Sequence, residues 1–204
     1  YNAVKRPAVT VSSVFLLFVA ILYFLDDSGL LSAVVPAVVL HELSHLLALR
    51  RVGAAPTRLS IGMSGLCIDY FGDLNAREEI ITALAGPAGG LAGALLCSQL
   101  GRMLASRFWT CCAGVGLLLS GFNLLPAMPL DGGRALFYCL SGRCGAAKAR
   151  RILNVLGMLI SISLILAGLF LFFRRCGIAV LAAGFWLLVL GVDAPCKTPK
   201  VSIK

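Results

Sequence analysis

Long apolar runs constrain this chain more than any other feature of its sequence. Six runs cover residues 7–25, 28–49, 80–101, 108–126, 152–173 and 176–192, and five of them carry no charged residue. A helix that crosses a bilayer needs about 20 consecutive apolar residues. The whole chain is 59% hydrophobic, with a mean hydropathy of +0.95. The sequence therefore predicts an all-α polytopic membrane protein with about six transmembrane helices.

The basic residues predict how these helices are oriented. Cytoplasmic loops of membrane proteins carry an excess of Lys and Arg. A cytoplasmic N-terminus places 14 of the 18 basic residues on the cytoplasmic side, and both termini are then cytoplasmic. This bias, together with contact with anionic lipid, accounts for the net charge of +9, so we predict no nucleic-acid partner.

A short polar segment after the second run has a different periodicity. Between Thr57 and Tyr70, apolar and polar residues alternate on either side of the pair Ser64-Gly65. Alternation with a central break predicts a small β-hairpin or re-entrant segment. The alternative is an ordinary loop between two helices.

The second run contains the sequence HELSH at residues 41–45. Residues four apart lie on the same face of a helix, so His41 and His45 can bind one metal ion. Glu42 lies about 100° further round the helix, where it can act as a general base. The alternative is a pair of core histidines with a partnered glutamate. Ionisable groups are rare in a membrane helix, and these are the chain's only two histidines, so we favour the metal site.

A catalytic zinc ion usually has three protein ligands, which leaves one ligand to be found. Most of the other acidic residues lie in predicted loops, but Asp131 follows a long uncharged run. Pro126 and Pro129 must interrupt a helix there. A carboxylate at membrane depth is tolerated where it lines a cavity or meets a partner. We therefore predict Asp131 as the third ligand; the alternative is that it caps a short helix after Gly132.

HELSH in one predicted helix and NLLPAMPLDGG in a later one resemble the motifs of site-2 proteases, the intramembrane zinc metalloproteases of peptidase family M50. The likeness covers roughly residues 8–192. The short chain and LDGG are most similar to the branch of stage IV sporulation protein FB. The resemblance implies that one Zn²⁺ is bound by His41, His45 and Asp131, and that Glu42 is the base.

The resemblance also implies roles for two further positions. Asn123 falls on an asparagine that holds substrate or the developing oxyanion in the family, although its side chain alone fits helix packing equally well. The segment AGPAGG at residues 85–90 matches a third family element at Gly86 and Pro87, but Gly90 stands where the family has asparagine. Here we favour close helix packing by small residues.

These features predict a zinc metalloendopeptidase that cleaves membrane-tethered proteins near the cytoplasmic side. We expect residues 1–204 to form a single transmembrane metalloprotease domain that contains no PDZ or CBS domain, in a bacterial cytoplasmic membrane. The expected partners are the lipid bilayer and the protein substrate; the sequence names no regulatory partner or oligomeric state. Two alternatives are a metal transporter with an intramembrane site and an inactive homologue that binds membrane proteins.

Overall fold

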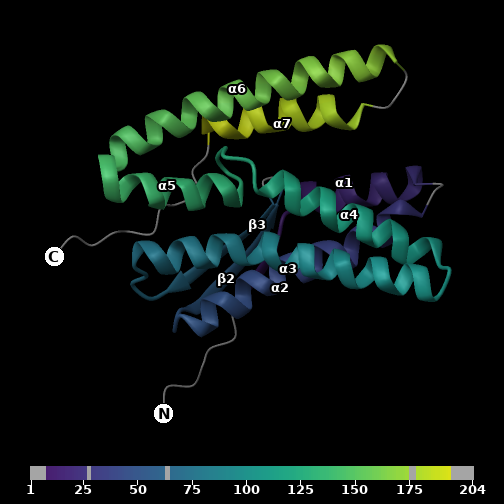
Figure 1. Cartoon of the computed structure of the whole chain (residues 1–204), viewed down its shortest axis with the longest axis horizontal. Helices are drawn as coiled ribbons and strands as arrows, with labels where there is room; N and C mark the ends of the chain where they lie inside the picture. The colour runs from purple at the N-terminus through teal and green to yellow at the C-terminus, as the bar shows by residue number, and fades with distance from the viewer. Residues whose placement is uncertain (1–7, 27–28, 63–64, 175–177, 194–204) are drawn as a thin grey trace. The chain divides into compact units, whose positions relative to one another are not determined.

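The computed structural model describes residues 8–26, 29–62, 65–174 and 178–193 of the chain (Figure 1). The chain divides after Asn123 into two compact units. The first contains β1 (Ala8–Val11), α1 (Ser13–Leu25), α2 (Leu30–Arg51), β2 (Ala55–Gly62), β3 (Gly65–Phe71), α3 (Ala76–Met103) and α4 (Arg107–Asn123). The second contains α5 (Asp131–Cys144), α6 (Ala146–Phe173) and α7 (Ala179–Asp193).

The predicted hairpin is confirmed and belongs to a larger sheet. Strands β2 and β3 pair antiparallel, with Leu59 opposite Ile68. Strand β1 pairs parallel with the other edge of β2, and the strand order is β1-β2-β3. The prediction of a helix over residues 7–25 is therefore wrong at residues 8–11. Their sequence, AVTV, is rich in β-branched residues, and apolar composition alone does not separate a strand from a helix.

Three of the helices are long and apolar enough to cross a membrane: α2, α3 and α6. This supports a membrane protein. Helices α1, α4 and α7 have 13, 17 and 15 residues, fewer than the about 20 that a helix typically needs to cross a bilayer. The structure therefore supports a mostly helical membrane fold with a small sheet. Among the described residues, three helices are long enough to cross a membrane, and the expected six crossings are not shown.

Helix α3 begins earlier than its apolar run because its first turn is polar and capped. The side chain of Asn75 accepts hydrogen bonds from the backbone N–H groups of Arg77 and Glu78, and the Glu78 side chain accepts from the backbone N–H of Asn75. This capping box satisfies N–H groups that the helix itself cannot pair. It fixes the start of the helix that packs directly against α2.

Small residues allow α2, α3 and α4 to approach closely. A Cβ atom added to Gly93 of α3 would lie 2.7 Å from Leu40 Cδ1 of α2, and one added to Gly116 of α4 would lie 3.3 Å from Ala94 Cβ of α3. Glycine at such contacts brings helix backbones together. The three helices therefore form the packed framework that carries HELSH.

In the second unit, α6 and α7 run side by side (Figure 1). Their contact also depends on glycine: a Cβ at Gly168 would lie 2.4 Å from the backbone nitrogen of Leu181, and one at Gly184 would lie 2.8 Å from that of Ile165. Helix α5 packs against α6.

Candidate metal centre

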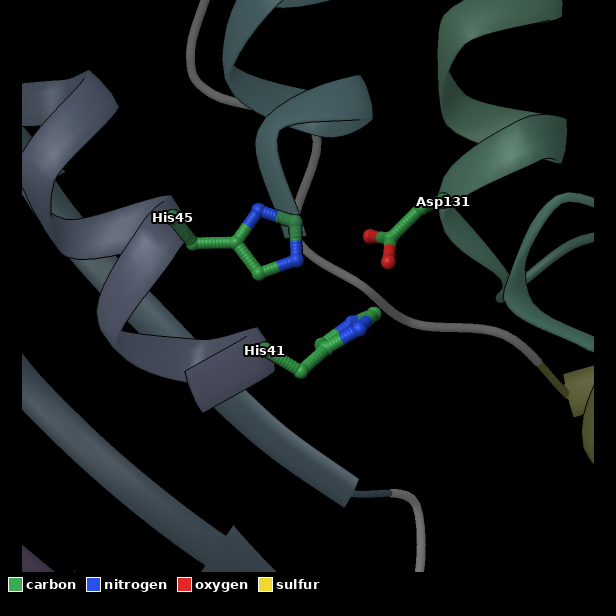
Figure 2. A group of neighbouring side chains, drawn as sticks. All are labelled: His41, His45 and Asp131. Carbon is green, nitrogen blue, oxygen red and sulfur yellow. The ribbon is translucent and has the colours of Figure 1, made fainter. Parts of the chain in front are cut away.

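The two histidines of HELSH lie together on one buried face of α2. Only 3% of His41 and 7% of His45 is exposed, and their ring centroids are 5.0 Å apart. Figure 2 shows both rings projecting from the same side of the helix. The predicted i, i+4 pairing of the imidazoles is therefore present within the first unit, in a helix long enough to cross a membrane.

The orientation of the His45 ring is set by α3. Its Nδ1 lies 2.7 Å from the backbone carbonyl oxygen of Thr82. A neutral imidazole that donates Nδ1–H to a carbonyl keeps the lone pair of Nε2 for a metal ion. Two buried histidines oriented in this way suit zinc, which prefers nitrogen ligands of this kind.

Gly86 makes room for the Nε2 edge of the His45 ring. A Cβ atom at Gly86 would lie 2.1 Å from Nε2, 2.6 Å from Cε1 and 2.7 Å from Cδ2 of His45. Three ring atoms would thus clash with one methyl group. A glycine at residue 86 therefore lets α3 pass directly beside the nitrogen that faces away from Thr82.

We predict that Gly86→Ala lowers zinc affinity at least about 10-fold, the lower end of the loss seen when the support of a metal-binding histidine is removed. The methyl group forces the His45 ring to leave the position that its Nδ1 contact with Thr82 maintains. Zinc affinity of the purified chain, measured by competition with a chromogenic chelator, tests this. Gly114→Ala is the matched control, because a Cβ at Gly114 meets no atom within 4 Å. Equal affinities in the two variants would contradict the assigned role of Gly86.

Glu42 follows His41 on α2 and is partly buried. Adjacent residues on a helix point about 100° apart, so Glu42 does not share the face of the two histidines. Its carboxylate is therefore placed beside that face, which is the position expected of a general base in this motif.

Asp131 is the first residue of α5 and is 8% exposed (Figure 2). The residue in the N-cap position is Leu130, and its side chain makes no capping hydrogen bond. The alternative role of Asp131 as the cap of a helix after Gly132 is therefore wrong, because the helix already includes Asp131. A carboxylate in the first turn still gains from the helix dipole.

The two glycines after Asp131 allow another part of the chain to approach α5 closely. Both lie inside the first turn of α5. A Cβ at Gly132 would lie 2.1 Å from the carbonyl oxygen of Leu124, and one at Gly133 would lie 2.4 Å from that of Ala127. The glycines thus let the proline-containing segment 124–130 fold back against the helix, which fixes the backbone around Asp131.

His41, His45 and Asp131 each offer one ligand atom and are residues that could hold a metal ion. Two imidazoles and a carboxylate are a donor set suited to a zinc site that keeps one position open for water or substrate. Asp131 belongs to the second unit of the chain, and its part as the third ligand is a proposal.

Asn123 is the last residue of α4, and its side-chain Nδ2 donates to the carbonyl oxygen of Leu119 at 2.9 Å. This bond lies within one helix and fits a structural role. A catalytic role for Asn123 stays a prediction.

The Gly-rich segment of α3 agrees with close packing. A Cβ at Gly89 would lie 1.8 Å from Ser44 Oγ, and one at Gly90 would lie 2.3 Å from Ser120 Oγ. A side chain as large as asparagine therefore does not fit at residue 90 unless its neighbours move. The hydroxyl of a serine of α4 borders the space that such a side chain would enter.

Three buried polar side chains in the described part of the first unit were not identified from the sequence: Glu79, Thr82 and Ser120. Ser120 is fully buried in α4, and Glu79 is 2% exposed in the first turn of α3, where it accepts a hydrogen bond from the Tyr70 hydroxyl of β3. The capping signature at Asn75 and Glu78 places Glu79 on a helix rather than in a loop. A single serine in an apolar run gives no such signal.

Comparisons with known proteins agree with a metalloprotease. Residues 65–164 match the model of peptidase family M50. Rip3 of Mycobacterium tuberculosis, named as a zinc metalloprotease, is 31% identical over 191 residues, which cover 84% of this chain and 45% of Rip3. Zinc metalloprotease MJ0392 of Methanocaldococcus jannaschii is 28% identical over 145 residues, which cover 65% of this chain and 40% of that protein. The chain thus spans less than half the length of these relatives.

The fold has a solved counterpart. A site-2 protease from Methanocaldococcus jannaschii is similar over 100% of this chain and 97% of its own, with a TM-score of 0.74 and 20% identity. At this identity the likeness establishes the fold alone. The HELSH motif lies outside the segment matched by the family model, whereas Asp131 lies inside it.

Proposed function

We propose that this chain, whose place in peptidase family M50 is supported by the family model, the curated relatives and the fold, is a zinc-dependent intramembrane endopeptidase. One observation carries the proposal. His41 and His45 are buried side by side on a membrane-length helix, and Glu42 lies beside them. Burial of such groups in an apolar helix is costly unless they serve a site.

We infer that His41 and His45 bind zinc together with Asp131. The three side chains are all at least nine-tenths buried and comprise the ligand types of a catalytic zinc site. His45 is supported by the Thr82 carbonyl, and the backbone around Asp131 is fixed by the close approach of segment 124–130.

A bound zinc ion supplies Lewis-acid activation of water and of the scissile carbonyl group. Glu42 accepts a proton from the attacking water as its oxygen bonds to the carbonyl carbon. The carboxyl group then returns this proton to the leaving nitrogen when the C–N bond breaks. Each turnover consumes one water molecule and leaves Glu42 ionised again. A helical substrate must unwind before attack, because its carbonyl groups are hydrogen-bonded.

The proposed substrates are membrane-tethered proteins cut near the cytoplasmic side of a bacterial cell membrane. Strand β3 is an edge of the sheet, whereas β2 is paired on both sides. An extended peptide could therefore add to β3 but not to β2, where Ile61 already pairs with Val11 and Leu66. The similarity to the branch of stage IV sporulation protein FB, and the action of residues 1–204 as one metalloprotease domain, belong to this proposal.

The proposed topology has six crossings and cytoplasmic termini, with shorter apolar segments adding to α2, α3 and α6. The parallel pairing of β1 with β2 supports one part of it, because it places the start of α1 and the end of α2 at the same sheet. The basic residues Arg50 and Arg51 end α2 there, which favours the cytoplasmic side.

We predict that Ser32→Cys is labelled by a membrane-impermeant maleimide from outside the cell, whereas Lys148→Cys is labelled only after lysis. Both residues are exposed at helix starts. The variants are made in a background without the native cysteines. Labelling of Lys148→Cys in intact cells would show that the start of α6 faces the outside of the cell, and the proposed orientation would then be wrong.

The proposed function is tested by co-expressing the chain with a membrane-tethered reporter substrate and measuring release of a soluble fragment. Release should require zinc and should stop with a chelator. A metal transporter is the second candidate, because it would also bury His, Glu and Asp at membrane depth. Zinc flux into vesicles without any cleavage would favour the transporter, and neither flux nor cleavage would favour the inactive homologue.

A further inference from the structure

Ser120 of α4 is a fully buried hydroxyl that makes no hydrogen bond with any residue the structure describes. Other serines in these apolar helices, such as Ser44 and Ser161, behave differently. Ser44 donates to the carbonyl oxygen of Leu40 at 2.7 Å, and Ser161 donates to that of Gly157 at 2.8 Å. Such a bond to the preceding turn is the usual solution for a serine in an apolar helix. Ser120 does not use it, so its hydroxyl is available to another group.

The Ser120 hydroxyl faces α3 at Gly90, beside the ring of His41. A Cβ atom built on Gly90 would lie 2.3 Å from Ser120 Oγ and 3.5 Å from His41 Nδ1. The oxygen and the ring nitrogen therefore border the same small space, which the glycine leaves open. A buried polar atom aimed at such a space lowers its free energy only by pairing there.

His45 shows which kind of partner the Nδ1 atom of His41 needs. His45 Nδ1 contacts the Thr82 carbonyl oxygen of α3, which leaves Nε2 for the metal. An imidazole that binds zinc through Nε2 carries its hydrogen on Nδ1 and needs an acceptor there. The hydroxyl of Ser120 is the uncharged acceptor beside the corresponding nitrogen of His41.

We propose that Ser120 is a positioning residue for His41: its hydroxyl accepts a hydrogen bond from Nδ1–H when Nε2 of His41 binds zinc. Gly90 has no side chain because one would fill the space where the two groups meet. The proposal rests on the proposed metal site and adds a residue of α4 to it. Each histidine is then oriented from a different neighbouring helix, His45 from α3 and His41 from α4.

The test is the zinc affinity of the purified full chain, measured by competition with a chromogenic chelator, together with the visible spectrum of the Co²⁺-loaded protein. Ser120→Ala should lower zinc affinity about 10- to 100-fold, the usual effect of losing an outer partner of a metal-bound histidine. Its Co²⁺ bands should also shift. Ser161→Ala is the matched control, since Ser161 is equally buried but bonded within its own helix, and it should change neither quantity.

Gly90→Ala provides a second, independent variant, because its methyl group displaces the Ser120 hydroxyl without deleting it. It should lower zinc affinity to the level of Ser120→Ala, and the double variant should be no worse than either single one. Ser120→Ala that binds zinc within twofold of the wild type, with an unchanged Co²⁺ spectrum, would overturn the inference. If Ser120→Ala does not fold, Gly90→Ala with wild-type affinity would overturn it instead. A wild-type chain that binds no zinc at all would instead overturn the metal site itself.

Discussion

Glu42→Gln should retain close to the zinc content of the wild-type chain while proteolysis falls by about 10²–10⁴-fold, the contribution of a positioned general base. The two histidines occupy one face of α2, and Glu42 lies beside that face, about 100° round the helix. Glutamine has almost the same shape but does not accept a proton. The substitution therefore removes the proton transfer and leaves the packing of α2 in place.

The measurement compares zinc per folded chain with release of a soluble fragment from a tethered substrate. His45→Ala is the informative control, because loss of a ligand should remove both zinc and cleavage. If Glu42→Gln itself loses zinc, the carboxylate is a ligand rather than the base. If it cleaves at the wild-type rate, another group accepts the proton and the proposed mechanism is wrong.

The two candidate metal-binding histidines could be singled out from the sequence because their chemistry contrasts with their surroundings. His41 and His45 are the only histidines of the chain, and they stand at helical spacing in an apolar run. The structure confirms that the pair is buried on one face. The hairpin could be predicted for a similar reason, since its alternation interrupts a sequence of helical runs.

Features that depend on a distant neighbour could not be predicted in this way. Strand β1 exists because residues 8–11 pair with β2, about 50 residues later, and the β-branched residues of AVTV do not by themselves exclude the start of an apolar helix. The role of Gly86 likewise depends on which atom of α2 faces it. The sequence shows that small residues are present at residues 85–90, but not that one of them lies against a histidine nitrogen.

The environment of Asp131 could be predicted only in part from the sequence. The sequence singled it out as a carboxylate after a broken apolar run, and the structure removes the competing idea that it is a helix cap. It is 8% exposed and lies in the first turn of α5, where the helix dipole favours a carboxylate.

Asp131→Ala and Asp131→Asn should both lower zinc affinity by more than about 100-fold, the upper limit for loss of a mere outer partner. Each variant removes the anionic ligand and leaves the two histidines of α2. Added zinc should raise the Tm of the wild-type chain, because a ligand stabilises the state that binds it, and should leave the Tm of both variants unchanged. Zinc per folded chain, measured with the Tm, separates this from a structural role, in which Asp131→Asn would fold less stably but bind zinc normally. Normal zinc content and a normal zinc-dependent Tm in Asp131→Asn would assign Asp131 to the helix terminus and leave the third ligand to another residue.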